Sequence, residues 1–210
     1  MYGPNIWPRG LPGFREGVYA YHQSAVALGR VLFKAFARAL GVTEDFFEDK
    51  TDKPMAQLRL IYYPPQDGRI RARRIGVGAH TDYECFTILL QTAAGLQVRN
   101  TAGDWIEAPP IPGTLVINIG DMPMRWTNGE FASTLHRVVN VTGAARYSFP
   151  LFFGANYDVV ARPLPTFSSS ANPPKYPPTK CGPWTVMNIT KVYEYRRAHR
   201  DHIENPELTD

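Results

Sequence analysis

The first fifty residues combine an irregular opening with a long amphipathic pattern. Apolar side chains recur at alternating steps of three and four residues, which predicts one buried face of a helix over residues 14–40. These side chains are Phe14, Val18, Tyr21, Ala25, Leu28, Leu32, Ala35 and Leu40. Gly41 is placed to end this helix, and Thr43 predicts the capped start of a short second helix. We therefore expect residues 1–53 to form a helical support.

From about residue 57 to residue 153 the pattern changes to short β-prone stretches separated by turn formers. The expected strands are 57–63, 86–91, 96–99, 104–107, 115–119 and 147–153. Asn128-Gly129 is the strongest short-range hairpin signal, and we expect it to join Arg125-Trp126 to the stretch that carries His136. Many short strands with regular turns indicate a β-sandwich, barrel or jelly roll, so the predicted fold is mainly β with flanking helices.

The last part of the chain is interpreted as a tail on this core. Residues 163–183 are rich in proline and serine, which predicts an ordered surface excursion without regular structure. Residues 184–202 are expected to form a closing helix. At 210 residues the chain is most simply one domain, with residues 57–153 as its core.

Composition and charge narrow the class of protein. The hydrophobic content of 44% is typical of a globular protein, and the net charge of +4 is modest. Basic residues cluster over 69–74 and again at Arg196, Arg197 and Arg200. We interpret them as solvated faces, with an anion- or partner-facing role as the alternative, because nucleic-acid binding usually needs a continuous basic surface. We identify no signal-peptide pattern and no apolar run long enough to span a bilayer in this sequence, so we expect a cytoplasmic protein without membrane contact.

The two cysteines suggest no disulfide framework, since Cys85 and Cys181 have no paired spacing. Cys85 lies three residues after Asp82, which could bring it near a metal. A small core residue is the favoured interpretation.

The main chemical signal is His80-Thr81-Asp82 followed far downstream by His136. Residues two apart in an extended strand point to the same side, so His80 and Asp82 can each give one ligand to a shared ion, with His136 supplied by a facing strand. Two histidines and one carboxylate with open positions are typical of non-haem Fe(II) oxygenases, whereas a structural zinc site is closed and often rich in cysteine. The alternative for any single histidine is a satisfied core residue. The other histidines, His22, His199 and His202, lie in helical sequence and are expected at the surface.

Arg146-Tyr147-Ser148 is a second polar pattern in strand-like sequence. A guanidinium can pair bidentately with a carboxylate, and a serine two residues on can bond the same group. The pair could hold the distal carboxylate of a dicarboxylic co-substrate whose other end chelates the metal. The alternative is an arginine in a surface ion pair.

These motifs together resemble one family. The segments that carry the resemblance are Leu58-Arg59-Leu60-Ile61-Tyr62-Tyr63-Pro64, Gly78-Ala79-His80-Thr81-Asp82-Tyr83, Gly95-Leu96-Gln97-Val98, Val116-Ile117-Asn118-Ile119-Gly120-Asp121, Trp126-Thr127-Asn128-Gly129, Ser133-Thr134-Leu135-His136-Arg137-Val138 and Arg146-Tyr147-Ser148-Phe149. The chain is similar over nearly its whole length to the isopenicillin N synthase-like 2-oxoglutarate/Fe(II)-dependent dioxygenases. The resemblance implies a double-stranded β-helix, or jelly-roll, core.

The resemblance also implies roles for individual residues. The iron ligands would be His80, Asp82 and His136. The distal carboxylate of 2-oxoglutarate would be held by Arg146 and Ser148, and Tyr63 would lie near the metal-binding end of that co-substrate. Phe152 matches a position that often lines the substrate pocket.

The activity implied is oxidation of a small organic molecule, by hydroxylation or desaturation, with Fe(II), 2-oxoglutarate and O2, in a setting expected to be secondary metabolism. One alternative is a catalytically silent homologue that binds iron and 2-oxoglutarate. Another is a nucleic-acid demethylase. That group tends to have a second arginine six residues after the first, and position 152 here is Phe, so no nucleic-acid partner is expected.

Two features depart from the family pattern. Ile61 stands where the family often has Asn, so one polar pocket contact is expected to be missing. Family members usually carry a sizeable segment before the position of Gly3-Pro4-Asn5, which makes this an N-terminally short member. The expected consequence is an exposed apolar patch, with self-association or uncoupled turnover.

Overall fold

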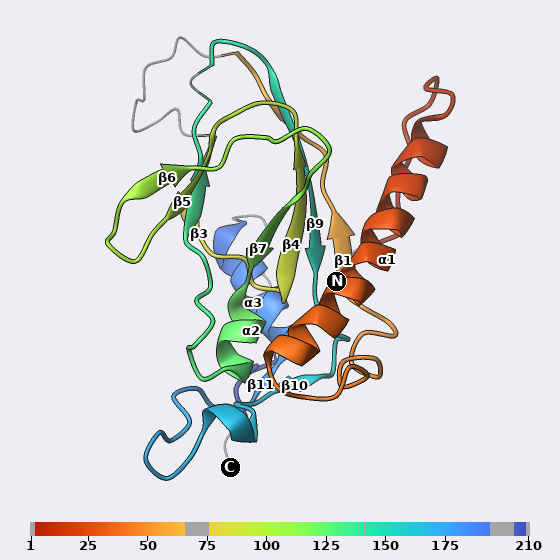
Figure 1. Cartoon of the computed structure of the whole chain (residues 1–210). Coiled ribbons are helices and arrows are strands. Elements are labelled where there is room, and N and C mark those ends of the chain that lie inside the picture. The colour runs from red at the N-terminus through yellow and green to blue at the C-terminus, as the bar shows by residue number, and fades with distance from the viewer. Residues whose placement is uncertain (1–2, 66–75, 141, 194–203, 209–210) are drawn as a thin grey trace.

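A computed structural model describes residues 3–65, 76–140, 142–193 and 204–208, and it consists of two main antiparallel sheets with helices around them (Figure 1). The larger sheet contains β1 (Ala56–Leu58), β2 (Ile61–Tyr63), β9 (Arg146–Phe153), β4 (Phe86–Gln91) and β7 (Val116–Ile119). The smaller sheet runs in the order β3 (Val77–His80), β8 (His136–Val138), β5 (Leu96–Arg99) and β6 (Trp105–Glu107). This confirms the predicted fold, mainly β with flanking helices on a jelly-roll core.

The long helix α1 (Phe14–Ala39) packs along the larger sheet, beside β1 and β9 in Figure 1. Close approach requires Gly29, because a Cβ there would lie 2.4 Å from the ring of Phe153 on β9. Gly41, at φ 70°, ends the helix as predicted. The helix and its stop are therefore confirmed.

The buried face of α1 is displaced from the predicted one. Its fully buried residues are Ala25, Gly29, Phe33 and Ala37, spaced four apart. Ala35 was predicted on the buried face, which was wrong: it faces solvent, because the line of closest packing follows Gly29 and Phe33. The predicted short helix after Thr43 was also wrong: consecutive turns cover residues 44–50, with the Phe46 N–H donating to the Thr43 carbonyl at 3.0 Å.

The main core lies between α1 and the larger sheet. Phe33 contacts Phe86 and Phe153 with ring centroids 4.9 and 5.5 Å away, and the latter two rings stack at 5.4 Å. Cys85 is fully buried in the same cluster and is a core residue, as favoured from the sequence. Cys181 is buried as well, and both cysteines are free thiols.

A single predicted strand over 57–63 is split into β1 and β2, which both pair with β9 in one register. Pro150 lies opposite the break. The Arg59 N–H donates to the Pro150 carbonyl at 3.0 Å, but proline has no N–H to return. The ladder is interrupted there for that reason. The other predicted strands are confirmed to within one residue at each end.

The prediction of a β-hairpin at Asn128-Gly129 was wrong. Residues Asp121–Trp126 form helix α2, and Asn128 and Gly129 end it with φ values of 52° and 93°. The Gly129 N–H donates to the Met124 carbonyl at 2.8 Å, as in a left-handed helix stop. The same residue pair thus serves a helix end, because both turns need positive φ.

The segment 163–183 contains more regular structure than predicted. It includes a 3-10 turn, η1 (Pro165–Phe167), and β11 (Thr179–Lys180), which pairs with β10 (Val160–Ala161). It also includes the start of helix α3 (Cys181–Val192), three residues earlier than expected, because Pro183 is tolerated in a first helical turn. The Asn128 side chain holds the loop, donating to the carbonyls of Phe167 and Pro173 at 3.2 and 3.1 Å.

Several predictions concern residues outside the described ranges. They are the basic cluster 69–74, the residues Arg196, Arg197 and Arg200, the histidines His199 and His202, and the end of the helix expected over 184–202. His22 was predicted at the surface, but it is half-buried and its Nε2 lies 3.1 Å from the Ala56 carbonyl oxygen. Within the described residues, no helix is long and apolar enough to cross a bilayer.

Candidate metal centre

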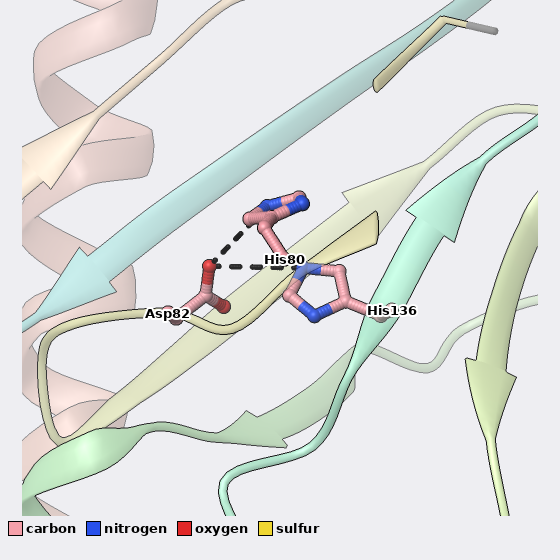
Figure 2. Close-up of side chains that lie close together, drawn as sticks. All are labelled: His80, Asp82 and His136. Carbon is pink, nitrogen blue, oxygen red and sulfur yellow. Dashed lines mark ion pairs between the residues drawn. The ribbon is translucent and has the colours of Figure 1, made fainter. Parts of the chain in front are cut away.

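The three residues singled out from the sequence converge on one point between the sheets (Figure 2). Asp82 Oδ1 lies 3.8 Å from His80 Nε2 and 3.7 Å from His136 Nε2. The imidazole rings have centroids 4.2 Å apart. One ligand atom from each residue therefore lies within 4.8 Å of the other two, an arrangement that could hold a metal ion.

Strand pairing brings the histidines together. His80 ends β3, His136 begins β8, and their Cα atoms are direct partners across the antiparallel ladder. His136 was predicted on a strand facing that of His80; this was wrong, because the two strands are paired neighbours in one sheet, which already brings their side chains into contact. Asp82 was predicted in the same strand as His80, but β3 ends at His80 and Asp82 lies in the loop that follows.

Hydrogen bonds to the other ring nitrogens set the direction of both imidazoles. His80 Nδ1 lies 2.8 Å from the Gly78 carbonyl oxygen, and His136 Nδ1 lies 3.0 Å from that of Thr134. A carbonyl accepts only from a protonated Nδ1, so Nε2 of each neutral ring carries the free lone pair. Both lone pairs then belong to the atoms nearest Asp82.

Two residues that were not predicted from the sequence hold the Asp82 carboxylate in place. Asp82 Oδ2 accepts hydrogen bonds from Thr87 Oγ1 at 2.5 Å and from Asn118 Nδ2 at 2.7 Å. Thr87 on β4 and Asn118 on β7 are themselves cross-strand partners. They occupy Oδ2 and leave Oδ1 directed at the histidines. Only the pairing of β4 with β7 could have revealed this, because the two residues are far apart in the sequence.

Burial shapes the electrostatics of the centre. The pKa of His80 is lowered, first because burial disfavours the charged ring and second because His136 is close. A lowered pKa favours the neutral imidazole, which is the form that binds metals. Nearby, burial raises the pKa of the Glu84 carboxyl to about 8, with the charge of Asp82 as the second cause.

A cavity of about 110 Å³ opens beside these ligands and is lined from both sheets. Three of the predicted site residues, Tyr63, Ser148 and Phe152, line it together with His80, Asp82 and His136. Ile61, the residue that departs from the family pattern, is another part of its wall and lies opposite Ser148 in the ladder. The rest of the wall is mostly apolar and includes Leu89, Leu96, Val98 and Val116.

Arg146 lies behind this cavity and is fully buried. Its Cζ lies 4.8 Å from the centroid of the Tyr63 ring. Nη2 donates to Gln91 Oε1 at 2.8 Å and Nε to the Ala93 carbonyl at 3.1 Å, which excludes the alternative of a surface ion pair. Nη1 is buried and has no hydrogen-bond partner among the residues that the structure describes. Burial lowers the pKa of Arg146, and an unpaired buried donor of this kind is the chemistry that an anionic ligand would satisfy.

Comparison with known proteins gives the same picture. A family model described as "2OG-Fe(II) oxygenase superfamily" matches residues 54–155. The chain is 40% identical over 183 residues to the "2-oxoglutarate-Fe(II) type oxidoreductase hxnY" of Emericella nidulans, covering 84% of this chain and 52% of that protein. It is also 40% identical over 179 residues to "Homoarginine-6-hydroxylase 2-ODD-C23" of Glycine max, covering 82% of this chain and 54% of that protein. The chain thus spans about half the length of these curated relatives.

Solved structures match in the same way. A full-length Neurospora crassa protein, solved in complex with alpha-KG and thymine, superposes with a TM-score of 0.84 at 30% identity, covering 90% of this chain and 61% of that one. A putative 2OG-Fe(II) oxygenase family protein from Caulobacter crescentus gives a TM-score of 0.80 at 34% identity, covering 89% and 62%. The fold, the family model and the His-Asp-His geometry agree, and the chain belongs to the 2OG-Fe(II) oxygenase superfamily.

Proposed function

We propose that residues 1–210 form one domain of an Fe(II)- and 2-oxoglutarate-dependent dioxygenase that oxidises a small organic molecule. The observation that carries the proposal is the convergence of His80 Nε2, His136 Nε2 and one oxygen of Asp82. Two nitrogens and one carboxylate oxygen without thiolates are the donor set suited to non-haem Fe(II) with open positions.

The metal would be held by His80, Asp82 and His136. Hydrogen bonds with neighbouring groups already orient these three side chains. Thr87 and Asn118 bond the carboxylate oxygen that is turned away from the histidines. Such outer contacts fix the ligands before the metal binds, and their loss typically weakens metal affinity by about 10- to 100-fold.

The co-substrate 2-oxoglutarate would lie in the cavity between the metal ligands and Arg146. Nη1 of Arg146 supports this role, because it is a buried cationic donor with no hydrogen-bond partner in the described part of the chain. Ser148 is two residues further along the same face of β9, and the Tyr63 ring lies over the guanidinium. With Nη2 engaged by Gln91, the carboxylate would be met by Nη1 and the Ser148 hydroxyl.

When bound, Fe(II) and 2-oxoglutarate would supply O2-dependent oxidation coupled to conversion of 2-oxoglutarate into succinate and CO2. The protein would bind and orient the reactants and exclude water from them. The apolar wall that includes Leu96, Val98 and Val116 supports the last role. Phe152, at the edge of the same cavity, would contact the organic substrate.

A small-molecule substrate is supported by the relatives, whose names include a homoarginine hydroxylase and whose structures include a thymine complex. Hydroxylation and desaturation are both compatible with the proposed chemistry. A cytoplasmic location, a place in secondary metabolism and self-association stay predictions.

The deciding experiment measures succinate released from 2-oxoglutarate by the purified chain under air, with Fe(II) supplied or omitted. We expect Fe(II)-dependent release in the unaltered chain and none in His136→Ala. The matched control is His22→Ala, which removes a half-buried histidine from α1, outside the centre. Binding of Fe(II) and 2-oxoglutarate without succinate release would instead identify a silent binding protein.

A further inference from the structure

The cavity of about 110 Å³ beside the candidate metal ligands, called the metal cavity below, has one Lys or Arg among the described residues that line it, Arg59. Arg59 follows β1 and lines the metal cavity together with His80, Asp82 and Phe152. The same four residues also line an adjoining open cavity of about 430 Å³, which extends to the end of α3. The guanidinium therefore lies where any molecule approaching the metal from that side must pass.

Aromatic rings hold this guanidinium in place. Its Cζ lies 5.4 Å from the ring centroid of Phe152 and 5.5 Å from that of Tyr193, and Nη1 donates to Tyr193 Oη at 2.6 Å. Stacking on ring faces orients a guanidinium and leaves its charge in place. Arg59 is thus a positioned cation and not a freely moving surface side chain.

Arg59 forms no ion pair with a described residue, although its charge acts on the nearby Glu84 carboxyl and opposes the rise in that group's pKa. No carboxylate in the described part of the chain lies within 4.0 Å of the guanidinium nitrogens, although Asp82 and Glu84 line the wider cavity. In the proposed function Asp82 is a metal ligand, so it would not serve as a counter-ion. A fixed, half-buried cation that forms no ion pair with the described residues is a setting in which an anionic ligand group gains from a charge-assisted contact.

One part of this wall is apolar and suits the body of an organic molecule, although Gln57 and Thr81 also line the wider cavity. Phe152, Ile189 and Val192 line the wider cavity, and the Tyr193 ring lies beside them. We propose that Arg59 is a specificity-determining residue that binds the carboxylate of an organic-acid substrate whose apolar body lies against this wall. The inference rests on the proposed function, because it concerns the substrate of that same metal centre.

Two other roles for Arg59 make different predictions. A structural clamp would only join β1 to the end of α3 through Tyr193. A second grip on 2-oxoglutarate would make Arg59 part of co-substrate binding. The test must separate substrate recognition from both.

The probes are matched pairs of acids and amides: phenylacetate with phenylacetamide, 4-phenylbutanoate with its amide, and octanoate with octanamide. Each pair has nearly one shape and differs in charge. Dissociation constants are measured by calorimetry without O2, once with Fe(II) and 2-oxoglutarate present and once without both. Thermal stability and 2-oxoglutarate affinity are measured on every variant.

We expect at least one acid to bind the unaltered protein roughly tenfold or more tightly than its amide, the size of a charge-assisted hydrogen bond. Arg59→Gln should abolish this preference, and Arg59→Lys should keep part of it because the charge remains. The matched control is Arg137→Gln. Arg137 also stacks on an aromatic ring, Trp105 at 4.1 Å, but strand alternation directs it away from the face of its neighbour His136.

Three results would overturn the inference: acids and amides that bind equally, no binding of any probe at millimolar concentration, or an acid preference that survives in Arg59→Gln. A fall in thermal stability with an unchanged preference would leave Arg59 as a clamp. A fall in 2-oxoglutarate affinity of the size seen for an Arg146 variant would assign it to the co-substrate. Failure of the unaltered chain to bind Fe(II) would instead count against the proposed function, and the titrations without metal would still measure the acid preference.

Discussion

The two faces of the larger sheet have different surroundings: one packs against α1, and the other, with both polar and apolar residues, lines the cavity beside the candidate metal ligands. On β4, Phe86 and Ile88 belong to the core against α1, whereas Thr87 and Leu89 line the metal cavity. On β9 the core face includes Phe153, and the cavity face includes Ser148, Pro150 and Phe152. One face is held together by apolar packing, and the other presents polar groups that could bind ligands. Stability and function are therefore separated by the period-two alternation of a strand.

The sharpest test of this separation uses neighbouring phenylalanines. Phe153→Ala should destabilise the fold by about 3–5 kcal/mol, because the ring is fully buried against Phe33, Phe86 and Gly29. Denaturant unfolding monitored by circular dichroism measures the loss. Phe152→Ala is the matched control and should cost much less, since its ring faces the cavity. Equal losses would mean that both faces contribute to the core.

Removing a metal ligand should abolish metal binding and leave the stability of the fold nearly unchanged. We expect His80→Ala and His136→Ala to lose nearly all Fe(II) occupancy while the free energy of unfolding of the metal-free protein changes little. Metal analysis after anaerobic loading, alongside the same denaturant curves, gives both quantities. Full occupancy in both variants would rule out the His-Asp-His centre as the iron site.

Arg146→Leu should weaken 2-oxoglutarate binding by roughly ten- to hundredfold, the worth of about 1.5–3 kcal/mol for a lost charge-assisted contact. Nη1, which makes no hydrogen bond with the described residues, is the donor that the co-substrate would lose. Arg146→Lys should be intermediate, since an ammonium keeps the charge without the planar donors. The measurement is the dependence of succinate release on 2-oxoglutarate concentration, and wild-type dependence in Arg146→Leu would place the carboxylate elsewhere.

Phe152→Ala should affect the two halves of the reaction unequally. Its ring borders the cavity and stacks on Arg59, so we expect a larger fall in substrate oxidation than in uncoupled decarboxylation of 2-oxoglutarate. Product and succinate are quantified in one reaction mixture. Parallel falls in both would make Phe152 a packing residue.

The smallest effect is expected for chemical labelling of Cys85 and Cys181, whose thiols are buried in the main core. Burial raises the pKa of Cys181 to about 12 and that of Cys85 well above its usual value, so both thiols stay protonated at pH 8. Labelling by a thiol-reactive disulfide should be slow in the folded protein and complete after denaturation. Rapid labelling of the native chain would show that the main core opens to water.

Structural features that depend on neighbouring residues in the sequence could be predicted from the sequence alone. The period of α1, its stop at Gly41 and most strands follow from hydrophobic spacing and turn chemistry. Asn128-Gly129 misled because positive φ serves a helix end as well as a hairpin. The break opposite Pro150 could be foreseen only from the partner strand, since the missing donor belongs to β9 and the interruption appears between β1 and β2.

The candidate site also contains residues that the sequence could identify and residues that it could not. His80, Asp82 and His136 were identified from spacing and family resemblance, and their convergence now supports that choice. Thr87 and Asn118 were missed because their role depends on a register that no short motif encodes. Arg59 was missed as a site residue for a related reason: its significance comes from the end of α3, more than a hundred residues away in the sequence, where Tyr193 meets it.

Because His80 pairs directly with His136, an ion bound at the candidate centre would link two neighbouring strands of the smaller sheet. A slip of one residue between β3 and β8 would turn one imidazole to the opposite face, so only the native register can bind the ion. By mass action, any ligand that binds this register alone also stabilises it, by about 2.7 kcal/mol at a hundredfold excess over the dissociation constant. The buried apolar cluster on this side is small: Tyr63, Leu89, Leu96 and Val138. Iron supply would then govern how long this half of the molecule resists proteolysis, as well as whether it reacts.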